Sequence, residues 1–199
     1  FAGVLTGPLV LSAHPPSAYG FVQTMIGAGL LSGGLLISVW GGPKTKRVPV
    51  LIGCIAVSSL GLLIVGVNQH LAFPAAGFFV MLLFVPIASS MSQAVFQTKV
   101  APAAQGRVFA VRGLIARSMM PVAYILSGLL ADHVFEPLMR EGGALANTPL
   151  GSLVGVGAGR GIGLLFVLAG LVGMSVSLLV YLNPRVRKLE QEIPDALAG

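Results

Sequence analysis

Residues 48–67 read VPVLIGCIAVSSLGLLIVGV, a run of twenty positions without a charged or amide side chain. A hydrocarbon core of about 30 Å needs about 20 helical residues to cross it. The run is apolar on every face, so it lacks the polar stripe that a soluble helix turns to water. We therefore predict a membrane-spanning helix here, and this segment decides the fold class.

Four more apolar runs of similar length surround this segment. Residues 1–12 form a sixth run that is too short to span alone, and we interpret it as the outer end of a helix whose beginning is missing. Because the first residue is Phe1 rather than Met, we interpret the chain as a piece of a longer one. The predicted transmembrane domain covers residues 1–182, and a charged tail covers 183–199. The predicted spans are 1–12 (partial), 19–40, 48–67, 71–97, 108–131 and 161–182.

The composition supports an all-α membrane protein. Apolar residues make up 55% of the chain and charged residues only 9%, whereas about 25% is usual for a soluble domain. The net charge of +6 does not indicate nucleic-acid binding, because the basic residues gather at the ends of the apolar runs. Cys54 is the single cysteine and the three histidines are scattered, so we expect no disulfide, metal or cofactor.

The basic residues also predict an orientation. Cytoplasmic loops of membrane proteins carry an excess of Lys and Arg. Nine basic residues fall on one side of the predicted spans and two on the other, which makes the first side, and the carboxy terminus, cytoplasmic. The nine are Lys44, Lys46, Arg47, Lys99, Arg107, Arg112, Arg185, Arg187 and Lys188, and the two are Arg140 and Arg160.

Polar side chains inside three of the predicted spans are the candidate site residues, because lipid cannot satisfy them. Arg117 is the strongest of them, since a cation deep in a span costs at least about 2.5–3.5 kcal/mol, and Met120 and Tyr124 share its helical face. The alternatives are a snorkelling arginine, hydrogen bonds between helices for the glutamines, and ordinary packing for the methionine. The candidate substrate-cavity residues are Gln23, Gln93, Gln97, Arg117, Met120 and Tyr124.

No catalytic set is visible, and we expect no enzymatic activity. All six acidic residues lie at or beyond the predicted membrane edges. A proton-coupled antiporter generally needs a carboxylate inside the membrane. Any proton carrier would therefore belong to a part of the protein outside this chain.

The loop after the second run carries a family resemblance. Residues 34–44 read GLLISVWGGPK, which resembles a degenerate copy of the loop signature of major facilitator transporters. Ser38 stands where the full motif carries its acid, and Val39 where it carries Arg, which puts a charge-relay role in doubt. The signature residues that this resemblance implies are Gly34, Gly41, Gly42, Lys44, Lys46 and Arg47.

Other segments resemble the bacterial macrolide-efflux-like branch of that superfamily. Residues 105–110 (QGRVFA), Pro121, residues 127–132 (SGLLAD) and residues 135–138 (FEPL) are similar to its eleventh helix and the outer extension of that helix. The resemblance implies a carboxy-terminal six-helix half with a truncated first helix. It also implies that the runs near Gln23, Gln93 and Arg117 line the central cavity, while the other two long runs face lipid.

The function implied is secondary active transport by alternating access, with efflux of drugs or other small hydrophobic molecules coupled to protons or other cations. The expected partners are the missing amino-terminal half, a small-molecule substrate and the lipid bilayer of a bacterial inner membrane. A permease or channel-like subunit is the alternative, and an intramembrane enzyme is a more remote one.

Overall fold

The computed structural model describes residues 2–43, 45–187 and 190. These residues form helices and connecting turns, with no strand among them. In chain order the elements are α1 (Ala2–Leu11), α2 (Pro16–Trp40), α3 (Arg47–Val67), α4 (Ala72–Lys99), α5 (Pro102–Leu130), the π-helical turn η1 (Ala131–Phe135), α6 (Glu136–Met139), α7 (Pro149–Val154), α8 (Arg160–Leu182) and α9 (Pro184–Arg187).

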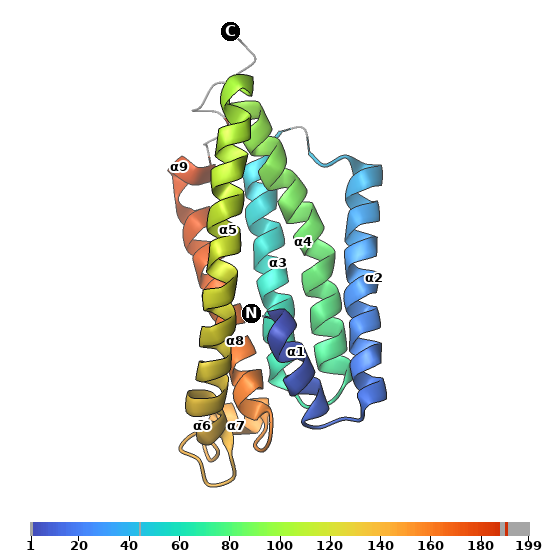
Figure 1. The fold of residues 1–199 in the computed structure, drawn as a ribbon, viewed down its shortest axis with the longest axis vertical. Helices are drawn as coiled ribbons and strands as arrows, with labels where there is room; N and C mark the ends of the chain where they lie inside the picture. Colours follow the sequence, from blue (N-terminus) through green and yellow to red (C-terminus); the bar gives the residue numbers. More distant parts are fainter. Residues whose placement is uncertain (1, 44, 188–189, 191–199) are drawn as a thin grey trace.

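Five segments of the described chain are long and apolar enough to cross a membrane: α2, α3, α4, α8 and the continuous stretch Pro102–Met139. They run side by side along the longest axis of the molecule (Figure 1). The short helix α9 lies at one end, here called the α9 end, and α6 and α7 lie at the other, here called the α6 end. The fold class predicted from the sequence, an all-α membrane protein, is confirmed.

The largest difference from the predicted spans concerns α5. The helix begins at Pro102 rather than at residue 108, and it continues through η1 and α6 to Met139 without a break. Proline suits the first turn of a helix because its missing N–H has no partner there in any case. Hydropathy did not detect this turn, because Gln105 and Arg107 make it polar although it is helical.

Glycines allow α3 to approach α4 until their backbones touch. A methyl group added to Gly61 would lie 2.7 Å from the carbonyl oxygen of Gly77, and one added to Gly77 would lie 2.6 Å from that of Gly61. Close approach through small residues is how helices associate in lipid, where no hydrophobic force draws them together. The α3–α4 contact is the most extensive between any two elements of the described chain.

Close packing at glycines also joins α8 to α3 and α2 to α4. On α8, a methyl group added to Gly170 would lie 2.7 Å from the backbone nitrogen of Leu63 on α3. On α2, a methyl group added to Gly29 would lie 2.7 Å from the carbonyl oxygen of Phe79 on α4. Helix α3 therefore holds α4 on one side and α8 on another, while α2 reaches the bundle through α4.

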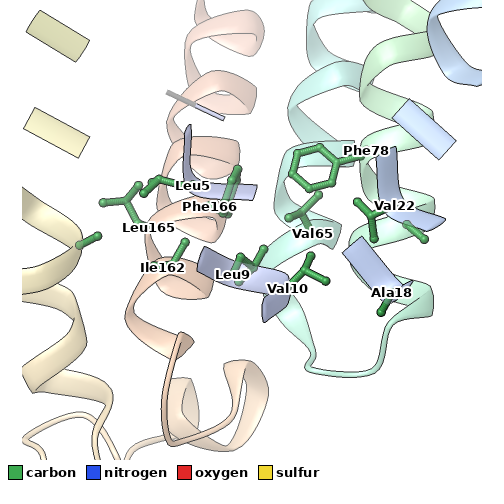
Figure 2. Packing of buried hydrophobic residues seen from close by; sticks show 12 residues of the cluster. Leu5, Leu9, Val10, Ala18, Val22, Val65, Phe78, Ile162, Leu165 and Phe166 are labelled. Atoms are coloured by element: carbon green, nitrogen blue, oxygen red, sulfur yellow. The ribbon is translucent and has the colours of Figure 1, made fainter. Parts of the chain in front are cut away.

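Helix α1 fills the remaining space near the α6 end. Figure 2 shows Leu9 and Val10 of α1 between Ile162 of α8 on one side and Val22 of α2 on the other. All four side chains are buried in one apolar cluster. Beside them the rings of Phe78 and Phe166 meet edge to face with centroids 5.7 Å apart, a favoured aromatic geometry.

We predict that Gly61→Leu lowers the thermal unfolding midpoint of the protein in detergent. Overpacking a tight contact lowers the free energy of unfolding by about 1–3 kcal/mol. The added side chain would here meet backbone atoms, which cannot move aside as a flexible side chain can. Unfolding can be followed with a thiol-reactive dye, because Cys54 is buried in the folded protein. Gly53→Leu on the same helix is the matched control, since nothing lies within 4 Å of its added carbon. Equal midpoints for the two variants would contradict the packing argument.

Candidate functional site

Arg117 lies near the middle of the long Pro102–Met139 segment, about 22 Å along it from Pro102 at 1.5 Å per residue. Its side chain is exposed. It has no hydrogen bond or ion pair with any residue that the structure describes. A guanidinium at this depth in a membrane span needs an acidic partner or water. The described part of the chain supplies no acid for it.

A shallow hollow of about 400 Å³ lies beside this arginine. Four other residues of α5 line it, and two of them, Ala110 and Gly113, are small enough to leave space in front of the guanidinium. Met120 and Tyr124, which follow on the Arg117 side of the helix, are 53% and 42% exposed. The complete lining is Phe109, Ala110, Gly113, Leu114 and Arg117.

Pro121 adds a second polar feature at the same place. A proline inside a helix has no N–H to donate to the carbonyl four residues earlier, and for Pro121 that carbonyl belongs to Arg117. Both the side chain and the backbone oxygen of Arg117 are therefore available to something outside α5. This combination at mid-helix was visible in the sequence as the spacing of Arg117 and Pro121.

The predicted glutamines do not form one cluster. Gln93 and Gln97 are exposed near the α9 end of α4. Gln23 lies toward the α6 end of α2, where its Nε2 donates to the hydroxyl oxygen of Tyr19 at 2.9 Å. Because the two groups sit near opposite ends of the bundle (Figure 1), a small substrate cannot contact both at once within this chain. The structure thus groups Arg117 with Met120 and Tyr124 and leaves Gln23 apart.

Arg112 joins α5 to α4 beside Gln93. Its Nη2 donates to the Ser92 hydroxyl at 2.8 Å, and its guanidinium carbon lies 4.8 Å from the centre of the Phe96 ring. A cation over an aromatic face is attracted by the ring quadrupole. Arg112, which the sequence analysis counted only among the basic residues of one side, thus holds α4 and α5 together.

Gly41 and Gly42 of the predicted loop signature lie between α2 and α3. Gly41 ends α2 with φ 69°, a conformation that glycine adopts without strain, and its N–H donates to the carbonyl of Ile37 at 2.9 Å. A side chain at Gly42 would collide with that of Met91 on α4. Lys46 precedes α3, and the Nε of Arg47 donates to the Pro43 carbonyl at 3.3 Å. Gly34 lies on α2 with open space before it, and Lys44 lies outside the described residues.

The sequence analysis missed a buried polar centre at the α6 end. Arg160, the first residue of α8, is 2% exposed, and its Nη1 donates to the carbonyl of Val154 at 2.8 Å. The carboxylate of Glu136 accepts the N–H groups of Gly159 and Gly161, at 2.8 and 3.1 Å. Those two N–H groups belong to the positive end of the α8 dipole, where a carboxylate is stabilising.

The sequence contains only a weak signal of the buried polar centre around Arg160 and Glu136. Glu136 was predicted only as one of six acids at or beyond the membrane edges, and residues 155–161 are rich in glycine. Gly159, with φ 78°, permits the backbone to aim its N–H at Glu136, and Gly161 packs directly against the backbone of Phe135 and Glu136. Twenty or more residues separate the partners in sequence, so spacing alone could not pair them.

The described residues contain no group of three or more side chains suited to hold a metal ion. The described residues form a multi-pass, all-α membrane protein in which Arg117, near the middle of a candidate span, is exposed and has no partner among them.

Two curated relatives share sequence with this chain. Macrolide efflux protein A of Streptococcus pyogenes is 32% identical over 126 residues, which is 60% of this chain and 30% of the relative. Macrolide efflux protein A of Enterococcus faecalis is 31% identical over 114 residues, 54% of this chain and 33% of that relative. The resemblance to the macrolide-efflux-like branch is thereby confirmed.

The matched region thus spans about a third of the length of these relatives. No protein-family model matches the chain, and no solved structure matches it significantly.

We predict that Glu136→Ala destabilises the α6 end of the molecule. The change removes two hydrogen bonds from the start of α8 and the negative charge near buried Arg160. Together these losses lower the free energy of unfolding by on the order of 3 kcal/mol. Hydrogen exchange of the backbone amides in residues 159–164 measures this directly and should accelerate. Glu141→Ala is the control, because Glu141 is exposed at the same end. Unchanged exchange in Glu136→Ala would show that the cap contributes nothing.

Proposed function

We propose that this chain is the carboxy-terminal half of a major-facilitator-type efflux transporter, and that it acts with an amino-terminal half of similar size. The loop signature and the similarity to macrolide efflux proteins support the family. The observation that carries the proposal is Arg117, an exposed guanidinium at mid-depth of a membrane span with no partner in the described chain. Its partner, or the water that solvates it, then belongs to a cavity between two halves.

The exposure of α2 and α5 supports the existence of a second half. Ser127 is the only buried residue along α5 in the described structure, and α2 is the next least buried of the five candidate spans. These helices carry the candidate residues Gln23 and Arg117. A helix with polar groups and so little cover within its own chain needs protein or water beside it.

Open glycines mark where partner helices would dock. On α2, Gly20, Gly27 and Gly34 recur every seven residues, which places them along one side of the helix, and none has a neighbour within 4 Å of an added carbon. On α5, Gly106 and Gly113 show the same spacing and the same open space. A line of small residues lets another helix approach closely, so these two lines are the proposed contact surfaces for the other half.

Transport would proceed by alternating access, with the two halves rocking about a site near the membrane midplane. The α9 end would face the cytoplasm of a bacterial cell, because the basic residues gather there. Helices α2, α3, α4, α5 and α8 contain no aspartate or glutamate, and the two acids of the continuous stretch Pro102–Met139, Asp132 and Glu136, follow α5 at the α6 end. In a proton-coupled cycle, the titrating carboxylate would therefore reside in the other half.

We predict that Arg117→Gln reduces drug efflux by the whole transporter at least about tenfold, the effect of losing one interaction of about 1.4 kcal/mol. Efflux of a macrolide from preloaded cells, at matched membrane expression, is the measurement. Arg107→Gln is the control, since Arg107 is also exposed on α5 but lies one or two turns from its start. Wild-type efflux by Arg117→Gln would remove Arg117 from the mechanism, and transport by the 199-residue chain alone would refute the two-half proposal.

A second prediction concerns the glycine line on α2. Gly27→Leu should weaken the association of this chain with a separately expressed amino-terminal half, because the new side chain holds the helices apart. Co-purification of the tagged halves from membranes gives the readout. Gly53→Leu should leave the yield unchanged, since Gly53 is equally open but lies on α3. Equal yields for both variants would place the docking surface elsewhere.

A further inference from the structure

An apolar groove runs along the surface between α3 and α8, on the side away from α2 in the helix packing. Its volume is about 460 Å³, within the range of about 300–1,000 Å³ typical of small-molecule pockets. Gly53 forms part of its floor on α3, where a side chain would meet nothing within 4 Å. Its walls include Pro49, Gly53 and Ala56 of α3 and Leu171, Leu178 and Tyr181 of α8.

The groove has the length of one membrane leaflet. Residues 171 to 181 of α8 cover ten helical steps, which is about 15 Å, or half of a hydrocarbon core of about 30 Å. Residue 181 is the last but one of the helix, so the lining extends from the α9 end of α8 to near its middle. A single acyl chain entering from that leaflet fits this length.

The interior of the groove offers little to a polar ligand. The hydroxyl of Ser177 already donates to the carbonyl of Gly173 at 2.8 Å. Ser175 is exposed and is the other serine in the lining. The remaining walls are aliphatic, proline, glycine or methionine, apart from the ring of Tyr181 at the α9 end.

A positive charge stands at that end. The guanidinium carbon of Arg187 on α9 lies 5.8 Å from the centre of the Tyr181 ring, and Arg187 has no acidic partner among the described residues. Arg185 lies on the same short helix. Aromatic rings at the membrane interface together with basic residues just beyond it are the usual anchors for lipid headgroups.

The nearest described acid is already engaged. The carboxylate of Glu190 accepts the N–H of Val48 at the start of α3, at 3.0 Å, and the Nζ of Lys99 donates to the backbone carbonyl of Glu190 at 2.8 Å. The start of α3 is therefore capped from within the chain. The backbone N–H of Val48 is thus not free for a phosphate, and Arg187 is the cation that the structure places beside the ring of Tyr181.

We propose that this groove binds an anionic phospholipid, with one acyl chain between α3 and α8 and the phosphate at Arg187. The site lies on a different side of α3 from its contact with α4, and its occupation needs only that the helices span a membrane. The lipid site is therefore independent of the proposed transport function.

The test measures lipid retention by native mass spectrometry of the detergent-purified protein, with added phosphatidylglycerol or phosphatidylcholine. Wild-type protein should retain phosphatidylglycerol in preference to phosphatidylcholine, and glycerol phosphate without chains should not compete. Arg187→Gln should weaken phosphatidylglycerol binding about fivefold, the effect of one basic residue near a lipid surface. Arg185→Gln removes the same charge from the same helix and should have less than half of that effect.

Filling the groove provides the second arm. Gly53→Leu, or Ala56→Leu if the first variant does not fold, should reduce retention of both lipids because the acyl chain loses its place. If Arg185→Gln and Arg187→Gln lose phosphatidylglycerol binding equally, the effect comes from general surface charge, and the proposed site is overturned. Unchanged lipid retention in the filled variants would overturn it too. If light scattering shows a wild-type dimer that the filled variants lose, the groove holds a second copy of the chain and the lipid proposal is overturned.

Discussion

The contact between Gly61 and Gly77 is the constraint on which the rest of the fold depends. At this point the backbones of α3 and α4 touch, and α3 then carries α8 on another face through Gly170. Lipid tails are as apolar as the side chains on the helix surfaces. Moving apolar surface from lipid into a helix contact therefore contributes little to helix association in a membrane. Close backbone packing has to supply the attraction, and it does so only where no side chain intervenes. Helix α3 is the centre of the bundle for that reason.

Helix α5 is attached differently, and its attachment defines the candidate site. At the α9 end Arg112 joins it to Ser92 and Phe96 of α4. At the α6 end its continuation through η1 and α6 reaches α8, where Glu136 caps the first turn. Between these two points it has only slight contact with α1 and α4. The stretch that is least supported is the one that carries Arg117 and Pro121, so the polar middle of α5 is held in position from its two ends.

Hydropathy was enough to predict the fold class, because the length of each apolar run can be read from a single sequence and compared with the thickness of a bilayer. It failed where structure depends on partners far along the chain. The polar start of α5 is helical because Pro102 begins it, and Arg160 is buried because a loop and Glu136 close over it. Helical spacing alone predicts that Arg117, Met120 and Tyr124 share a face, whereas no spacing in the sequence could place Gln23 relative to Gln97, because they lie on different helices.

Arg160 and Arg117 show how environment separates two residues of one type. Arg160 is almost wholly buried, and the same chain supplies it with a carbonyl at 2.8 Å and a carboxylate close by. These contacts come from within the chain, although the buried Nε of Arg160 has no hydrogen-bond partner among the described residues. Arg117 lies deeper in its span, is exposed, and receives nothing from the described residues. A membrane does not tolerate such a charge against acyl chains. Under the two-half proposal, the acid or water that compensates Arg117 comes from outside this bundle, on the side where α2 and α5 have little cover within the chain.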